Sequence, residues 1–320
     1  MTAVLRADVV VVGGGPAGLA AAIALGRSRR SVVIVDAGQP RNALAAAGHN
    51  VLGQEGVPPL ELLARGRAEA EGYGVRFVTG SATGATGIRD DFTIEVDDGA
   101  VQVHARRVIL ATGLVDDLPT VPGVAEAWGH TVLHCPFCHG WGVRDQRIAV
   151  LGRNENVLHQ VMLFRELSEH VTLFLHDAPE PTAEQWEQLA ALKVDVVTAR
   201  VERLIVAGTE VRAVQIVGGQ TFETDAVVVA PRFVARTELY EALGGAPTTT
   251  PFGTQIAAED ARGTTSVAGV WVTGNAGDLS AMIAGSAASG VLAGTAVHGD
   301  LTVADLATVV QARRARVPGE

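Results

Sequence analysis

A glycine-rich turn between two apolar, β-branched runs sets the tightest limit on what this chain can fold into. Residues 8–18 read Asp-Val-Val-Val-Val-Gly-Gly-Gly-Pro-Ala-Gly, and they are followed by an alanine-rich helical stretch, a second apolar run at 31–35, and Asp36. A strand, a GxGxxG turn, a helix, a second strand and a terminal acid in this order form the dinucleotide-binding fingerprint of a Rossmann unit. The sequence therefore predicts that the chain binds an adenine dinucleotide.

Each residue of the fingerprint has a physical role. Gly13 permits the turn, Gly15 lets a pyrophosphate approach the backbone, and Gly18 lets the helix pack against the strand. The helix N-terminus supplies amide donors to phosphates, and Asp36 is expected to accept hydrogen bonds from a ribose. The cofactor-binding residues predicted in this segment are Gly13, Gly15, Pro16, Ala17, Gly18, Asp36 and Ala37.

The same pattern returns later in the chain. A second strand and glycine turn lie at 147–152, with a helical stretch at 156–167, and a strand at 269–274 then leads into a helix near Asp278. A chain of 320 residues exceeds the usual size of one compact core. We therefore predict an α/β fold of two Rossmann-like, three-layer ββα domains, the second inserted into the first. The first domain is expected to span residues 1–116 and 246–320, and the inserted domain residues 117–245.

The only two cysteines stand in the string His134-Cys135-Pro136-Phe137-Cys138-His139, between the two glycine turns. Cys-x-x-Cys-His is also the haem-attachment signature, and two cysteines with two histidines can bind zinc, although adjacent residues cannot easily reach one metal. Two thiols at this spacing can instead form a redox-active disulfide. The dinucleotide fingerprint favours the redox interpretation, so no metal site is predicted, and haem and zinc stay as alternatives.

His139 directly follows the second cysteine. Thiol–disulfide exchange moves protons near neutral pH, which is the range in which histidine titrates. His139 is therefore the candidate acid/base, with His134 as the alternative. A histidine that only packs or caps is the competing explanation.

Charge and hydropathy exclude several classes of partner. A formal net charge of −10 disfavours nucleic acid and anionic membranes. The start of the chain lacks a basic region, and the apolar run at 9–12 is too short for a signal peptide, so we expect a cytoplasmic protein. Residues 279–297 are uncharged but rich in Gly, Ala, Ser and Thr. This composition predicts a buried helix in close contact with a ligand, not a membrane span.

With these motifs in this order, the chain resembles the low-molecular-weight thioredoxin reductases over nearly its whole length. The string Cys135-Pro-Phe-Cys138-His139-Gly140, with Arg41-Asn42 and Gly274-Asn275, is more similar to the dithiol oxidases of gliotoxin and holomycin biosynthesis. The resemblance implies FAD and a homodimer, with Cys138 facing the flavin and Cys135 meeting the substrate sulfur.

The resemblance also implies flavin contacts outside the fingerprint, and it shows two departures. His139 and Asn275 each stand where the reductases carry an aspartate. The further cofactor-binding residues are Arg41, Asn42, Asn50, Ala111, Thr112, Gly113, Gly274, Asn275, Met282, Ile283 and Ala284.

The second glycine turn is degenerate. Asn154 and Val157 occupy two of its glycine positions, where side chains would obstruct a pyrophosphate or push the helix from the strand. The segment His176-Asp177-Ala-Pro-Glu180 lacks the arginines that pair with a 2′-phosphate and offers acids instead. NADPH binding is therefore disfavoured, although a working site with altered glycines stays as the alternative.

These features together predict an FAD-dependent dithiol oxidase. It would form a disulfide in a small-molecule dithiol through Cys135 and Cys138, with O2 as electron acceptor and hydrogen peroxide as product. One alternative is an NAD(P)H-dependent reductase of thioredoxin or of a small disulfide, and another is a redox sensor without turnover. Because aromatic residues make up only 4% of the chain, no stacking platform for a substrate is expected.

Overall fold

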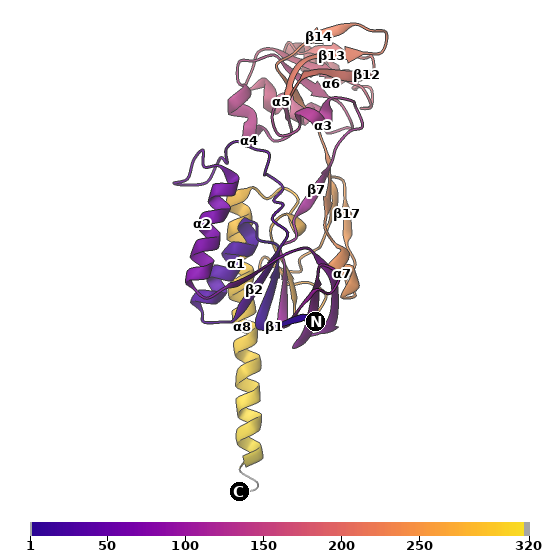
Figure 1. Ribbon diagram of the computed structural model, residues 1–320. Coiled ribbons are helices and arrows are strands. Elements are labelled where there is room, and N and C mark those ends of the chain that lie inside the picture. The colour runs from indigo at the N-terminus through magenta and orange to yellow at the C-terminus, as the bar shows by residue number, and fades with distance from the viewer. Residues whose placement is uncertain (1, 317–320) are drawn as a thin grey trace. The chain divides into compact units, whose positions relative to one another are not determined.

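The computed structural model describes residues 2–316, and the chain divides into two compact units (Figure 1). The second unit consists of Leu44–Pro58 and Asp116–Arg232, and the first unit contains the rest. The chain crosses between the units in β7 (Leu114–Asp117) and β16 (Arg232–Ala235), which share a four-stranded sheet with β17 (Thr248–Thr250) and β18 (Gly253–Gln255). The return to the first unit thus comes earlier than the expected residue 246, and residues 44–58 group with the second unit.

The first unit is built on a seven-stranded sheet in the order β3-β2-β1-β6-β5-β4, with β19 paired to β6. Strands β1, β2, β3, β6 and β19 run parallel, and β4 and β5 are antiparallel. Parallel strands covered on both faces read as continuous apolar runs, which explains the buried valines at 9–12. The strands are β1 Ala3–Val12, β2 Val32–Asp36, β3 Arg76–Thr79, β4 Ala82–Ile88, β5 Asp91–Val96, β6 Val101–Leu110 and β19 Val270–Val272.

Three helices cover one face of this sheet: α1 (Pro16–Arg27), α2 (Pro59–Gly72) and α8 (Ile283–Arg316) (Figure 1). On the other face, Leu239 and Tyr240 of the short helix α7 (Glu238–Ala242) pack against residues of the sheet. The first glycine turn lies between β1 of this sheet and α1 of the helix layer.

Helix α8 contacts α1 through backbone atoms. A Cβ atom on Gly290 would lie 2.1 Å from the carbonyl oxygen of Ala17, and one on Gly294 would lie 2.7 Å from that of Ala21. The small residues at 279–297 thus allow a close helix–helix contact. Among residues 2–316, no helix is both long and apolar enough to cross a membrane.

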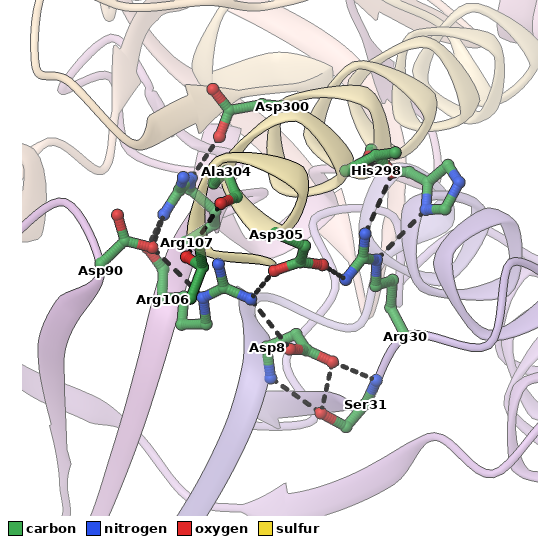
Figure 2. Close-up of polar contacts among 12 residues, drawn as sticks. Asp8, Arg30, Ser31, Asp90, Arg106, Arg107, His298, Asp300, Ala304 and Asp305 are labelled. Carbon is green, nitrogen blue, oxygen red and sulfur yellow. Dashed lines mark hydrogen bonds and ion pairs between the residues drawn. The ribbon is translucent and has the colours of Figure 1, made fainter. Parts of the chain in front are cut away.

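Ion pairs fasten the far part of α8 to the sheet (Figure 2). Arg107 on β6 is fully buried and donates a hydrogen bond to Asp300 of α8. One turn further on, Asp305 accepts from Arg106 at 2.7 Å and from Arg30 at 2.6 Å. Charge-assisted bonds of this kind to a planar guanidinium are geometrically specific, so they fix the rotation and height of α8.

The second unit repeats the plan with a five-stranded parallel sheet in the order β11-β10-β9-β15-β8. Its strands are β8 Val132–Leu133, β9 Ile148–Leu151, β10 Val171–Phe174, β11 Asp195–Val197 and β15 Ala226–Val228. An antiparallel meander follows, formed by β12 Val201–Ala207, β13 Glu210–Ile216 and β14 Thr221–Glu223. The helices are α3 Val124–Ala127, α4 Pro136–His139, α5 Val157–Arg165, α6 Ala183–Ala191 and the 3₁₀ turn η1 Gly140–Val143.

The contact between α8 and α1 leads to a prediction. Gly290→Ala should destabilise the first unit by about 2 kcal/mol, because the new methyl group has to displace backbone. Gly299→Ala is the matched control on the same helix, since a Cβ there meets nothing within 4 Å. It should leave stability unchanged or raise it by up to ~1 kcal/mol through helix propensity. Thermal unfolding of the purified variants measures both, and equal melting temperatures would contradict the close contact.

Candidate active site

The first glycine turn closes tightly on itself and on the end of β6. Gly13 has a φ of +107°, and a Cβ atom there would lie 2.2 Å from the carbonyl oxygen of Ala111. A Cβ on Gly18 would lie 1.9 Å from the carbonyl oxygen of Gly13. Both positions therefore exclude any side chain, as the fingerprint predicts.

Gly15 differs from these glycines because the space around it is open. It precedes Pro16 at the start of α1, and a Cβ atom there would meet nothing within 4 Å. The amides of the first helical turn have no partner within the helix and attract anions. The residues present therefore fit the pyrophosphate of a dinucleotide, and Asp36 fixes the turn by accepting from the Gly14 amide at 3.0 Å.

The residues that follow β6, Ala111 to Gly113, are the second predicted cofactor-contact segment. Hydrogen bonds to Arg236 hold this segment in place. The Thr112 hydroxyl donates to the carbonyl oxygen of Arg236 at 2.8 Å, and the Arg236 amide donates to that of Gly113 at 3.1 Å. Arg236 was absent from the sequence prediction because it lies 124 residues from Thr112 and no motif marks it.

The predicted flavin-contact residues before α8 lie in a turn that side-chain hydrogen bonds stabilise. The Asn275 amide group donates to the carbonyl oxygens of Asp278 and Ala281, at 3.1 and 2.9 Å, and its Oδ1 lies 3.5 Å from Nη1 of Arg41. Met282 is 40% exposed and immediately precedes α8, so the first amides of the helix follow it directly. Of the remaining predicted residues of the first unit, Ala37 and Ala284 are exposed, Asn42 and Ile283 are half-buried, and Ala17 and Gly274 are buried.

The cysteine pair lies at the start of α4 in the second unit. Cys135 is the N-cap residue, and its Sγ accepts a hydrogen bond from the amide of Cys138 at 3.2 Å. Both side chains are half-buried. A hydrogen bond to sulfur favours the thiolate over the thiol, so the geometry supports nucleophilic chemistry at this pair. Within residues 2–316, no cluster of three or more side chains could hold a metal ion.

The two histidines beside the pair have different surroundings. Nδ1 of His134 lies 3.1 Å from the carbonyl oxygen of Val229. The same ring nitrogen lies 3.3 Å from Nε2 of Gln160, so two partners hold the His134 ring in place. Nδ1 of His139 is buried and has no hydrogen-bond partner among the described residues. Burial, and after it the positive charge of His49, lower the pKa of His139, which favours the neutral ring.

Asn50 groups with the second unit, whereas the other predicted flavin-contact residues belong to the first unit. Its side-chain amide donates to the carbonyl oxygen of Phe137 at 2.8 Å. The loop at 44–58 therefore contacts the helix that carries the cysteines.

The second nucleotide edge contains arginines that the sequence did not place there. A pocket of about 160 Å³ is lined by Arg153, His176, Asp177 and Arg200, among others. The segment 176–180 itself contains no arginine, but Arg153 and Arg200 reach this pocket from other segments. Both are already bonded: Arg200 pairs with Asp177 at 2.8 Å, and Arg153 donates to the carbonyl oxygens of Asp117 and Ala230 at 3.0 and 3.3 Å.

Two exposed aromatic side chains flank the cysteines. Phe137 is 65% exposed and Trp141 is 73% exposed, and the Arg144 guanidinium stacks over the Trp141 ring at 4.3 Å. The low aromatic content had suggested no stacking platform, yet two of the few aromatic rings lie within three residues of Cys138. Aromatic rings bury large apolar areas on contact, so this surface suits an apolar ligand.

The class of protein follows from these features and from sequence matching. Residues 7–290 match the family described as pyridine nucleotide-disulphide oxidoreductases, and the chain belongs to that family. It is therefore an oxidoreductase, and the family implies flavin binding. The predicted thioredoxin reductase-like family and the predicted α/β fold with two dinucleotide-binding domains are confirmed.

Solved structures and curated relatives agree with this placement. HlmI superposes with a TM-score of 0.89 at 41% identity, over 97% of this chain and 96% of HlmI. The putative thioredoxin reductase TrxB of Bacillus anthracis superposes with a TM-score of 0.85 at 26% identity, over 93% of this chain and 99% of TrxB. The thioredoxin reductase tcpT of Claviceps purpurea is 32% identical over 217 residues, 65% of this chain and 68% of tcpT. The chain spans roughly half to two thirds of the length of the curated relatives that it matches.

The open space at Gly15 predicts a selective effect on cofactor binding. Gly15→Val should fold but lose at least about tenfold in bound FAD, because its side chain enters the space that the pyrophosphate needs. Gly72→Val is the control, since it is another glycine with nothing around its Cβ position. The flavin absorbance per chain and the melting temperature of the apoprotein measure the two effects. Normal flavin content in Gly15→Val would contradict this placement.

Proposed function

We propose that the protein is an FAD-dependent dithiol oxidase that forms a disulfide in a small-molecule dithiol. The observation that carries the proposal concerns the second unit, which has an intact cysteine pair. In the same unit, side chains of the protein already occupy the edge where a nicotinamide dinucleotide would bind. Arg153 spans the carbonyl groups there, and Asp177 is paired with Arg200. A nicotinamide dinucleotide would have to break these contacts, so electrons from the substrate are the better-supported source.

The residues of the first unit would hold the flavin. Gly13, Gly15 and Gly18 shape the pyrophosphate site, Asp36 lies at its edge, and the start of α8 at Ile283 supplies further amides. When bound, FAD accepts an electron pair from the reduced cysteines and passes it to dioxygen, which leaves as hydrogen peroxide.

The cysteine pair would carry out two exchange steps. A substrate thiolate attacks Sγ of Cys135 in the oxidised pair, so that a mixed disulfide forms and Cys138 leaves as a thiolate. The second substrate thiol gives its proton to the neutral ring of His139 and attacks the bound substrate sulfur, which closes the substrate disulfide and releases Cys135. The sum is dithiol plus O2 giving disulfide plus H2O2.

The surface beside the pair favours a small apolar substrate. Phe137 and Trp141 lie on α4 and η1, on either side of Cys138 and His139, and both are mostly exposed. The family resemblance implies a homodimer, and a cytoplasmic location stays an expectation from the sequence.

A second candidate is an NAD(P)H-dependent disulfide reductase. Two observations favour it: tcpT and TrxB carry the name thioredoxin reductase, and Arg153 and Arg200 would offer guanidinium groups to a phosphate if their present contacts opened. The direction of electron flow separates the two functions.

Aerobic turnover and anaerobic reduction test the main proposal. Dithiothreitol in air should be oxidised with equimolar peroxide, and Cys135→Ser or Cys138→Ser should lower the rate at least about a thousandfold, because neither single sulfur can complete the exchange. Excess NADPH without oxygen should leave the flavin oxidised, whereas dithiothreitol should bleach it. Rapid bleaching by NADPH would favour the reductase instead.

The aromatic surface predicts a change in substrate affinity. Trp141→Ala should raise KM for a bulky aromatic dithiol by about tenfold, which corresponds to ~1.4 kcal/mol of lost contact. KM for dithiothreitol should change little, because that substrate is too small to cover the ring. Phe252→Ala is the control, since Phe252 is 59% exposed and lies in the first unit. The same KM change for both dithiols would argue against a contact with the ring.

A further inference from the structure

An exposed arginine follows the two aromatic rings beside the cysteines. Arg144 comes directly after the 3₁₀ turn η1, and its Cζ lies 4.3 Å from the centre of the Trp141 ring. Nη1 of the same side chain donates to the carbonyl oxygen of Trp141 at 2.8 Å. Because an aromatic face attracts a cation, two contacts to one residue fix the orientation of the guanidinium.

The other edge of this guanidinium is free to bind a ligand. Within residues 2–316, Nε and Nη2 of Arg144 donate no hydrogen bond, and no carboxylate pairs with the side chain. Nitrogens in this arrangement hold a carboxylate through two parallel hydrogen bonds. Arg147, three residues further on, is different, because Glu223 and Asp225 already pair with it. Arg144 therefore keeps a two-donor edge for an anion from outside the chain.

The charge around the cysteines differs from that of the whole chain. The formal net charge is −10, yet residues 127–144 contain no aspartate or glutamate, and they include three histidines besides Arg144. Asp145 is exposed and forms no ion pair with any other described residue. On the loop that contacts Phe137, the Glu55 carboxylate is already bonded to His49. Since like charges repel an incoming anion, a segment without acids suits an anionic ligand.

The surface beside Arg144 also has room for a ligand. Gly142 stands between Trp141 and Arg144 in the sequence, and a Cβ atom on it would meet nothing within 4 Å. The Trp141 ring is mostly exposed. An apolar group can therefore cover this ring while an anionic group on the same molecule reaches the guanidinium.

We propose that Arg144 is a specificity-determining residue that binds a carboxylate on the substrate. The preferred substrates are then dithiols with an apolar body and an anionic end. In the proposed function, on which this inference rests, the two sulfurs react at Cys135 and Cys138, whereas the carboxylate binds Nε and Nη2 of Arg144. A contact away from the reacting atoms is equally strong in the bound substrate and in the transition state, so it lowers KM and leaves kcat unchanged.

Two dithiols that differ only at one end test the proposal. Dihydrolipoate ends in a carboxylate and dihydrolipoamide in a neutral amide, and each reacts with one O2 to give its cyclic disulfide and H2O2. For flavin-loaded wild-type enzyme, KM for dihydrolipoate should be about fivefold lower, the size expected for an exposed ion pair. High salt should reduce this difference, because it screens exposed charges.

Variants of Arg144 separate charge recognition from support of the Trp141 ring. Arg144→Gln should raise KM for dihydrolipoate about fivefold, while its kcat and both constants for dihydrolipoamide stay unchanged. Arg144→Lys should restore part of the preference, because lysine keeps the charge but lacks the two parallel donors. An equal rise of KM for both dithiols in Arg144→Gln would mean that Arg144 only supports Trp141, and it would overturn the proposal.

Arg203→Gln is the matched control. Arg203 is an exposed arginine of the same unit that bonds Gln215 and, among the described residues, no carboxylate. Its loss removes the same charge from another part of the unit, so both KM values should stay in place. A loss of the preference for dihydrolipoate in this variant would assign the preference to net charge and not to Arg144.

Binding of the oxidised products separates this inference from the function on which it rests. Calorimetry with lipoate and lipoamide measures the same contact without turnover. If wild-type enzyme oxidises no dithiol but binds lipoate more tightly, and Arg144→Gln loses the difference, the proposed function fails and the carboxylate contact stands. If turnover is present and the carboxylate gives no advantage in KM or in binding, the contact fails alone.

Discussion

Direct contact between backbone atoms is the constraint on which the first unit depends. The glycine turn closes against the end of β6 at Gly13 and Ala111, and α8 reaches the backbone of α1 at Gly290. These contacts bring the start of α1 and the start of α8 to the same sheet, where their amides can serve one cofactor. Arg107 and Asp300 hold the other part of α8 (Figure 2), so the helix cannot shift along its axis without breaking a buried ion pair. The proposed cofactor site is therefore a product of packing more than of any single residue.

The two units share a Rossmann-like architecture, but they differ at the edge where a dinucleotide would bind. In the first, the space above Gly15 is open, and the nearby acid holds the turn. In the second, Arg153 already donates to the carbonyl oxygen of Ala230, and Asp177 is already paired with Arg200. A ligand phosphate gains most from a guanidinium that has no other partner, because existing bonds must first be exchanged. These occupied guanidinium groups are the basis of the proposal that the second unit binds no nicotinamide cofactor.

Local patterns were sufficient for most of the architecture. The first strand, turn and helix follow from alternating apolar runs and glycine spacing, and β1, α1 and β2 lie where the sequence placed them. The helix expected near Asp278 begins instead at Ile283, because Asn275 bonds the carbonyls of Asp278 and Ala281 and extends the turn. Contacts between distant segments were beyond such reasoning: Arg200 at the second nucleotide edge, Arg236 at Thr112, and Asn50 at Phe137. None of them has a spacing or composition signal, and each depends on how loops fold back.

The loop at 44–58 lies between β2 and α2 of the first unit in sequence, yet it groups with the second unit. Exchanging the second unit between related proteins therefore requires that both of its segments be moved together. A chimera that took only residues 116–232 from this protein would inherit both sulfurs and His139 but would leave Asn50, which bonds to the carbonyl oxygen of Phe137, to the recipient. A chimera that keeps the cysteines together with the loop at 44–58 needs four junctions along the chain, because the second unit consists of two separate segments.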